Sequence, residues 1–191
     1  MKHHGWRVKV LKGQGYILKF CLVLSAFLVF VTTPATLLCA PKSELEMKAV
    51  CILNFPVFVE WPGTAMSGTN NFLNICVLGG NPIFTVLDSL KEKECGVKMV
   101  KIRTVTETKE LSACHILFIG SSDASQITPL LNQLMNKPVL TISDHESFDK
   151  NGGIIRFYIR DNVVKFKINN EAAKKAGLTI SSQLLELAGG E

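Results

Sequence analysis

The 191-residue sequence predicts a single α/β domain with a mostly parallel central sheet, helices on both faces and a C-terminal antiparallel hairpin at the sheet edge. Three observations lead to this fold class. From Asn70 onward, apolar runs alternate with amphipathic stretches, which is typical of a parallel sheet covered by helices. The runs 74–80 and 115–119 are almost wholly apolar, as expected for strands buried on both faces. Near the C-terminus, two strand-like runs are separated by Asp161 and Asn162, a favourable two-residue hairpin turn.

The elements follow in order along the chain. Residues 43–59 form a helical stretch with one apolar face, and Pro56 is expected to kink the helix or to end its regular part. A strand at 71–78 precedes a helix from Pro82 to Lys93, because Asn81 and Pro82 are typical residues of a helix start. Further strands are expected at 97–104, 115–119, 138–143, 154–160 and 163–168, and further helices at 123–135, 171–176 (capped by Asn170) and 183–188 (started by Ser181 or Ser182).

Residues 1–35 have the layout of a secretory signal peptide. Five basic residues and no acidic one accompany an apolar run of about a dozen residues, shorter than the roughly 20 that span a bilayer. We expect cleavage after Ala35, with Ala40 as the alternative site, and an α/β domain in residues 43–189. An uncleaved anchor, or a lipoprotein acylated at Cys39, are the other interpretations. Export would place the domain in the periplasm.

The basic character of the chain belongs to this leader. Losing five of the 21 basic residues leaves 16, which equals the 16 acidic residues. A mature chain without net charge gives no electrostatic reason to expect a nucleic-acid partner.

Export also changes the interpretation of the cysteines, because thiols outside the cytosol are commonly oxidised. Cys76 and Cys114 lie at corresponding ends of two strands that the pattern places side by side, so a disulfide closing a loop of 38 residues is favoured. The alternative is two small buried thiols. Cys51 is expected to be a core thiol and Cys95 to lie in a polar turn. No spacing among the cysteines resembles a zinc site.

Three groups of residues could carry chemistry. Cys114 and His115 suggest a nucleophile and a base, but adjacent strand residues point to opposite faces, so the dyad is disfavoured. The turns 79–81 and 120–122 follow strands at the edge where α/β proteins bind ligands, although ordinary helix capping explains them better. A cluster of acidic and histidine side chains could hold a metal, but a solvated loop is favoured; it comprises Asp144, His145, Glu146 and Asp149.

Several segments together carry a family resemblance. They are Asn54-Phe55, Val59-Glu60-Trp61-Pro62, Ile75–Gly79, Cys114–Ile119, Pro138–Asp144, Gly152-Gly153, Val164–Asn169 and Ile180–Ala188. In this order they resemble the YfiR-like family of periplasmic repressor proteins. The resemblance covers nearly all of the mature chain. Its motif positions in this sequence are Trp61, Pro62, Gly79, His115, Gly152, Gly153, Asn169, Ser181 and Ser182.

The resemblance implies a homodimeric, non-enzymatic protein without a cofactor or metal. It implies repression of an inner-membrane diguanylate cyclase through that enzyme's periplasmic sensor domain, affecting cyclic di-GMP and biofilm formation, with relief by an outer-membrane lipoprotein. Cys76 and Cys114 match the family's cysteine positions. A second family disulfide, expected around residues 143–158, is excluded because no cysteine follows Cys114. The other hypotheses are a small-ligand-binding adaptor for a membrane receptor and, last, an exported thiol or hydrolytic enzyme.

Overall fold

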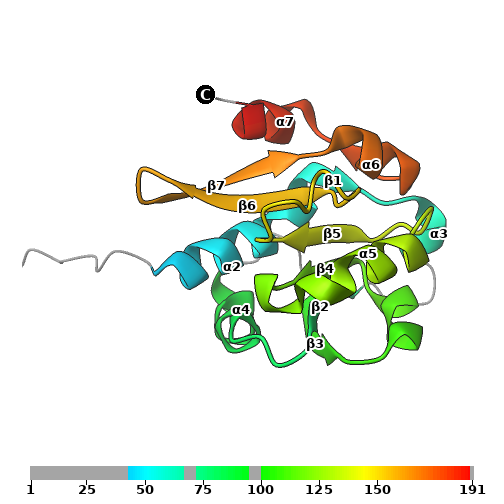
Figure 1. Cartoon of the computed structure of the whole chain (residues 1–191), viewed down its shortest axis with the longest axis horizontal. Helices are drawn as coiled ribbons and strands as arrows, with labels where there is room; N and C mark the ends of the chain where they lie inside the picture. The colour runs from blue at the N-terminus through cyan, green and yellow to red at the C-terminus, as the bar shows by residue number, and fades with distance from the viewer. Residues whose placement is uncertain (1–42, 67–71, 95–99, 190–191) are drawn as a thin grey trace, which may run out of the picture. The chain divides into compact units, whose positions relative to one another are not determined.

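The computed structural model describes residues 43–66, 72–94 and 100–189 (Figure 1). The predicted signal peptide, both cleavage sites, Cys39 and Cys95 lie outside these residues. A six-stranded sheet of order β3-β2-β4-β5-β6-β7 forms the centre, and its neighbours are parallel except for the antiparallel pair β6 and β7. The strands are Leu73–Leu78 (β2), Val100–Val105 (β3), Ile116–Ile119 (β4), Leu140–Ser143 (β5), Ile155–Arg160 (β6) and Val163–Ile168 (β7). The predicted fold class is confirmed.

Helices lie on both faces of this sheet (Figure 1). They are Glu44–Asn54 (α2), Gly63–Met66 (α3), Ile83–Glu94 (α4), Ala124–Gln133 (α5), Asn170–Lys175 (α6) and Ser182–Gly189 (α7), with 3-10 turns at Phe55–Phe58 (η1), Thr108–Ala113 (η2) and Ser121–Asp123 (η3). Alternate strand residues face opposite sides, so the core has two parts. The first buried cluster packs Ile75 and Phe118 against α2, α4 and α7, and the second packs Cys76 and Leu117 against α5.

The first helix begins and ends where the local sequence requires. The Ser43 hydroxyl accepts the backbone N–H of Glu46, whose carboxylate accepts the N–H of Ser43 in return, a reciprocal cap that satisfies two free donors. Pro56 ends the α-helix at Asn54, as predicted, and the chain continues as the 3-10 turn η1. This ending places Trp61 just beyond the helix, beside the parallel sheet.

Several boundaries differ from those predicted. The three strands at 71–78, 115–119 and 138–143 begin one or two residues later. The cap of α6 is Asn169 rather than Asn170, since the Asn169 side chain accepts the N–H of Ala172. The hairpin turn is confirmed, because Asp161 and Asn162 both have the left-handed φ values, 52° and 62°, that a tight hairpin needs.

A second, two-stranded sheet was not predicted. Val59–Glu60 (β1) pairs antiparallel with Thr179–Ile180 (β8), two segments more than 100 residues apart in the chain. The backbone N–H of Ser181 donates to the carbonyl of Phe58 at 2.9 Å and extends this contact. Strands of two residues leave almost no periodic signal in a sequence. The pair ties the chain before Trp61 to the start of α7.

Candidate functional site

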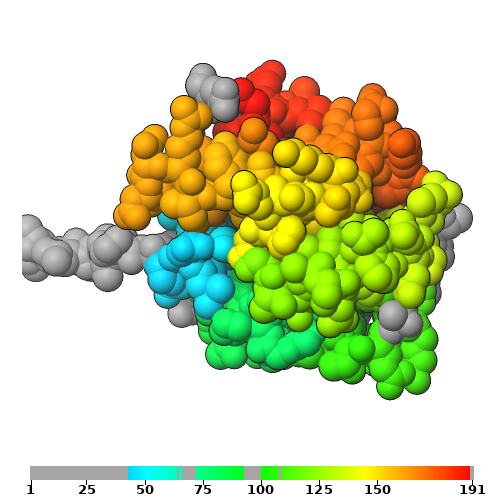
Figure 2. Space-filling view, in the orientation of Figure 1, coloured from blue at the N-terminus to red at the C-terminus, as the bar shows by residue number. Residues whose placement is uncertain are grey.

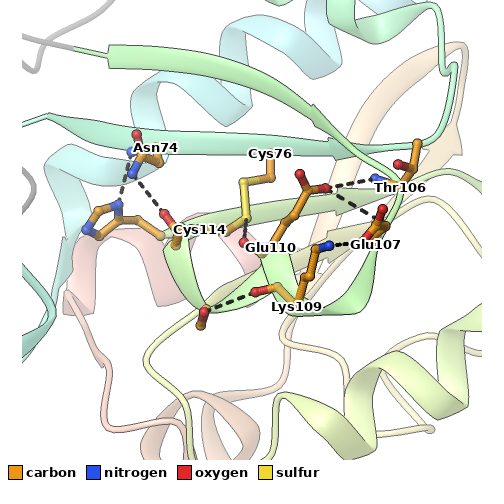
Figure 3. Close-up of a disulfide and its surroundings, with 10 residues drawn as sticks. Asn74, Cys76, Thr106, Glu107, Lys109, Glu110 and Cys114 are labelled. Atoms are coloured by element: carbon orange, nitrogen blue, oxygen red, sulfur yellow. Dashed lines mark hydrogen bonds and ion pairs between the residues drawn. A yellow bond between two sulfur atoms is a disulfide. The ribbon is translucent and has the colours of Figure 1, made fainter.

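The predicted disulfide is confirmed. Cys76 in β2 and Cys114, which comes just before β4, are bonded with their Cα atoms 5.8 Å apart (Figure 3). Both residues are almost fully buried in the second core cluster, and the Cys114 sulfur also lies 3.6 Å from the carbonyl oxygen of Glu110 in η2. The bond therefore joins two neighbouring parallel strands beneath α5. Oxidation removes Cys114 as a nucleophile.

His115 takes part in a different set of contacts from Cys114. Its Nδ1 accepts the backbone N–H of Asn74 at 3.0 Å, and its Nε2 lies 3.2 Å from the carbonyl oxygen of Ala65. These partners fix the neutral tautomer with the proton on Nε2. Burial lowers the pKa of His115, and the hydrogen bond to Ala65 offsets this only in part. Both ring nitrogens are engaged in structural hydrogen bonds, so His115 is not placed to activate Cys114.

Two predicted motif positions meet at this histidine. The indole ring of Trp61 lies edge-on to the imidazole of His115, with the ring centroids 6.4 Å apart. Trp61 is half-buried, and its Nε1 is buried without a hydrogen-bond partner among the described residues. Pro62 follows, also half-buried, and the N–H of Ala65 donates to its carbonyl. The structure therefore gathers Trp61, Pro62 and His115 at the amino end of β4.

Ser181 and Ser182 belong to the beginning of α7. The Ser181 hydroxyl accepts the backbone N–H of Leu184 at 3.3 Å and so caps the helix, while Ser182 is its exposed first residue. Through the β1–β8 pair, Ser181 is linked to Phe58, three residues before Trp61. This role is structural: it fixes where the last helix leaves the sheet.

A second group of predicted motif positions lies at the beginning of β6 and comprises Gly152, Gly153 and Asn169. Gly152 has a φ of 94°, and a Cβ at Gly153 would overlap the buried ring of Phe148. The Asn169 amide donates to the carbonyl of Asp149 at 3.0 Å, and its backbone N–H donates to that of Ile154 at 2.8 Å. The three residues therefore hold a tight turn onto the start of β6. Gly79, with a φ of 63°, has a similar turn-forming role after β2.

A groove of about 550 Å³ adjoins the turn. Gly152 and Asn169 belong to its wall, together with Leu131 of α5, Met135 just after that helix, and Lys175 of α6. Sequence reasoning missed this groove, because α5 and α6 are far apart in the chain and only the tertiary fold brings them to one place.

Two acidic residues of the predicted polar cluster, Asp144 and Asp149, form ion pairs with different basic residues. The carboxylate of Asp144 binds the Lys48 ammonium at 2.8 Å and accepts the backbone N–H of Ser121 with its other oxygen. Asp149 lies 2.9 Å from Arg156. Within the described residues, no three His, Cys, Asp or Glu side chains are grouped so that they could hold a metal ion. These carboxylates have structural partners.

Lys48 is a buried residue that joins two carboxylates, and sequence reasoning missed it. Its side chain is 8% exposed and bridges Glu44 at 2.7 Å and Asp144 at 2.8 Å. Burial tends to lower the pKa of Lys48, but the hydrogen bonds and charges of Asp144 and Glu44 outweigh that effect and raise it. The only signal in the sequence was a lysine on the apolar side of an amphipathic helix. The ion pair fastens α2 to the carboxyl ends of β4 and β5.

The turn after β2 is capped by its own Asn81, whereas the turn 120–122 after β4 has no side-chain cap. Asn81 accepts the backbone N–H of Ile83 at 3.0 Å with its side-chain oxygen, and its amide nitrogen lies where a Cβ at Gly120 would be. Strand order reverses between β2 and β4, which is the position where α/β sheets commonly bind ligands. Near this position, the side chains of Asn81 and Asp144 accept hydrogen bonds from the backbone N–H groups of Ile83 and Ser121.

The chain matches a known protein family over most of its length. Residues 45–189 match the YfiR/HmsC-like family. The chain belongs to the YfiR/HmsC-like family. This family is periplasmic, regulatory and non-catalytic, and it regulates cyclic di-GMP signalling. The YfiR/HmsC-like match includes both cysteines of the disulfide and every predicted motif position.

Family context suggests interaction with a membrane signalling protein. In the part of the chain that the structure describes, no helix has the length and apolar character needed to cross a bilayer.

Proposed function

We propose that this protein binds the periplasmic sensor domain of an inner-membrane diguanylate cyclase and holds that enzyme inactive, which lowers cyclic di-GMP and restrains biofilm formation. The observation that carries the proposal is the YfiR/HmsC-like match across residues 45–189. The contacts of the polar residues agree with it. Cys114, His115 and Asp144, the side chains that suggested chemistry, are engaged in a disulfide, backbone hydrogen bonds and an ion pair. A surface that binds protein needs no catalytic group.

The mechanism follows from thermodynamic linkage. A repressor that binds the inactive arrangement of the sensor domain more tightly than the active one shifts the enzyme toward inactivity. Any event that weakens this binding releases the enzyme, and capture by an outer-membrane lipoprotein is the event we propose. The repressor is proposed to act as a homodimer.

The same proposal includes export. Residues 1–35 are proposed to be a signal peptide, removed after Ala35 or at the alternative site Ala40, so that the domain 43–189 acts in the periplasm. Amino-terminal sequencing of the protein from a periplasmic extract tests this directly. A mature chain that begins at Thr36 or Pro41 supports cleavage, whereas recovery of the intact chain from the membrane fraction contradicts it.

Cyclic di-GMP in a clean deletion strain tests the function. We expect the level to rise on deletion and to return to the parental level when the full chain is supplied from a plasmid. A Cys76→Ser copy is expected to restore it only partly, because the disulfide supports the folded repressor. An unchanged level in the deletion strain, under several growth and redox conditions, would contradict the proposal.

A second candidate function is small-ligand binding, and the groove beside α5 and α6 favours it. A volume of about 550 Å³ falls within the usual range for ligand sites, roughly 300–1,000 Å³. Thermal melting of the protein against a panel of periplasmic metabolites would detect such a ligand. An Ala172→Phe variant, which puts a large ring into the groove, should abolish any shift that arises there.

A further inference from the structure

The hairpin of β6 and β7 carries a row of basic residues on one face. Cross-strand register places Arg156 opposite Lys167, Tyr158 opposite Lys165, and Arg160 opposite Val163. Because alternate residues of a strand share a face, these side chains lie on the same side of the hairpin. We define the basic face by its polar members, which are Arg156, Tyr158, Arg160, Lys165 and Lys167.

A tyrosine lies at the centre of the basic face. The guanidinium of Arg156 and the ammonium of Lys167 lie 5.5 and 5.8 Å from the Tyr158 ring centroid. Cation–π contacts at this range hold the charged groups close to the ring. The face is therefore an ordered arrangement of cations around an aromatic ring.

The charges on the basic face are only partly neutralised. Asp149 pairs with Arg156 at 2.9 Å, and Asp161 approaches Arg160 at 4.0 Å. Among the described residues, neither Lys165 nor Lys167 has a carboxylate within ion-pair distance. Lys167 and Arg160 are exposed, and Lys165 and Tyr158 are half-exposed. Lys165 and Lys167 therefore give this face positive charge that no carboxylate of the described residues pairs with.

The opposite face of β7 is occupied by the protein's own core. Val164, Phe166 and Ile168 pack against the first buried cluster, which includes Leu184 of α7. The sheet ends at β7 in the described chain. Figure 2 shows the hairpin, in orange, at the surface of the molecule. The basic face is thus the side of the hairpin available to another molecule.

We propose that the basic face is the docking surface for an acidic stretch of the partner protein. This inference rests on the proposed function and names the surface that contacts the sensor domain. Charge complementarity selects the partner's chemistry: carboxylates would meet the unpaired ammonium groups of Lys165 and Lys167, and Tyr158 supplies contact area between them. Complementary charges across such an interface set the orientation and the association rate.

Asp161 argues against a lipid surface as the partner. Its side chain is 91% exposed at the hairpin turn, next to Arg160. An anionic membrane approached by this turn would meet a carboxylate first, which opposes binding. An acidic protein surface can lie along the hairpin face and avoid the turn.

Lysines on edge strands also have a protective role, because they discourage pairing between sheets. The chain offers a matched control for this role. Lys101 and Arg103 occupy alternate, exposed positions on β3, the edge strand at the other side of the sheet. Reversal of either pair changes the net charge equally. Only the pair on β7 belongs to the basic face.

The first experiment locates acid binding on the purified mature chain, without reference to the pathway. Backbone NMR resonances are followed during titration with hexaglutamate at low salt. We expect shifts confined to β6 and β7, and roughly tenfold weaker binding in K165E/K167E but not in K101E/R103E. Binding that is unaffected by K165E/K167E, or shifts centred on β3, would overturn the proposal. Vesicles containing phosphatidylglycerol test the alternative. If they bind through Lys165 and Lys167 while hexaglutamate does not, the assignment to a protein partner is wrong.

The second experiment uses the deletion strain. The full chain is expected to restore parental cyclic di-GMP, K101E/R103E is expected to do the same, and K165E/K167E is expected to leave the deletion level. Equal protein abundance and melting temperature exclude misfolding, and K165Q/K167Q, which removes charge without reversing it, should restore repression in part. Full restoration by K165E/K167E overturns the docking surface while leaving the proposed function intact. If deletion itself changes nothing, the proposed function fails, and the hexaglutamate titration alone decides the surface.

Discussion

Nδ1 of His115 accepts the backbone N–H of Asn74 across the two central strands, at a distance of 3.0 Å. The bond uses a side chain to satisfy a backbone donor at the beginning of β2, just before the two strands pair directly from Ile75 and Ile116 onward. The Asn74 side chain completes the junction by donating to the carbonyl of Ala113 at 2.8 Å. A buried imidazole acting as an acceptor must remain neutral, which gives the fold a dependence on pH.

Protonation of His115 should destabilise the protein in mild acid. Burial lowers the pKa of His115 in the folded state, whereas the unfolded chain takes up this proton near pH 6.5. Between the two pKa values the unfolded state binds more protons, so the stability is complete above about pH 6.5 and falls as the pH drops toward the folded pKa. Urea melts at pH 7.5, 6.0 and 5.0 should show a loss of up to about 1.4 kcal/mol per pH unit from this group.

The matched variants for this prediction are His115→Gln and His145→Gln. The first should remove the histidine-dependent part of the slope, and the second should retain it. A slope that is identical in the parent and in His115→Gln would show that the imidazole is not its source.

Loss of the disulfide should cost more stability than loss of the Cys51 thiol. Closing a loop of 38 residues contributes about 3–4 kcal/mol on the chain-entropy view. Chemical denaturation of C76A/C114A is expected to show a free energy of unfolding lower than the parent's by that amount. Reductant should lower the free energy of unfolding of the parent protein similarly. Cys51→Ala removes a half-buried thiol and leaves the bond intact. A C76A/C114A variant as stable as the parent would contradict the prediction.

Substitutions of Lys48 and Asp144 should have non-additive effects on the free energy of unfolding, because the two side chains form an ion pair. Lys48→Met strands the Asp144 carboxylate, and Asp144→Asn weakens the hold on the Lys48 ammonium, so each change is expected to cost about 1–3 kcal/mol. The double variant should cost less than the sum, since it removes both charges together. Lys91 and Asp88, a more exposed pair at 2.7 Å on α4, provide the control, and the same cycle there should stay within about 0.5 kcal/mol. Full additivity at Lys48 and Asp144 would mean that the two charges do not interact.

Replacing Gly153 with alanine should destabilise the protein, whereas the same replacement at Gly80 should not. A Cβ at Gly153 meets the buried Phe148 ring, and overpacking of this kind costs about 1–3 kcal/mol. At Gly80 a Cβ meets nothing within 4 Å, so Gly80→Ala is expected to be neutral or slightly stabilising. Thermal melts of the two alanine variants give the comparison. Equal melting temperatures would show that Phe148 moves aside at little cost.

Much of the fold could be predicted because its signals are local. Apolar runs placed the central strands, Pro56 placed the end of the first helix, and Asp161-Asn162 placed the hairpin turn. The Cys76–Cys114 pair followed from strand order combined with an oxidising compartment. The cap of α6 was assigned one residue late, because Asn169 and Asn170 are equally good caps in isolation, and only the contacts of Asn169 with Asp149 and Ile154 select it.

The Lys48–Asp144 ion pair and the basic face could not be predicted from the sequence. Both depend on which residues the fold brings close together. Lys48 and Asp144 are 96 positions apart, and their pairing follows from the packing of α2 beside the carboxyl end of β5. The basic face likewise requires the register of β6 against β7 to place Lys165 and Lys167 on the same side as Tyr158.

By itself, the sequence determined the fold class, the sequence order of the strands of the central sheet and the disulfide of this YfiR/HmsC-like domain. These follow from periodicity, turn chemistry and cysteine placement, which act within a few residues or between neighbouring strands. The tertiary structure alone decided that His115 is a neutral strand-joining acceptor, that Lys48 is buried, and which side of the last hairpin remains open. Burial and partner choice depend on segments far apart in the chain, and folding has to bring those segments together before either is defined.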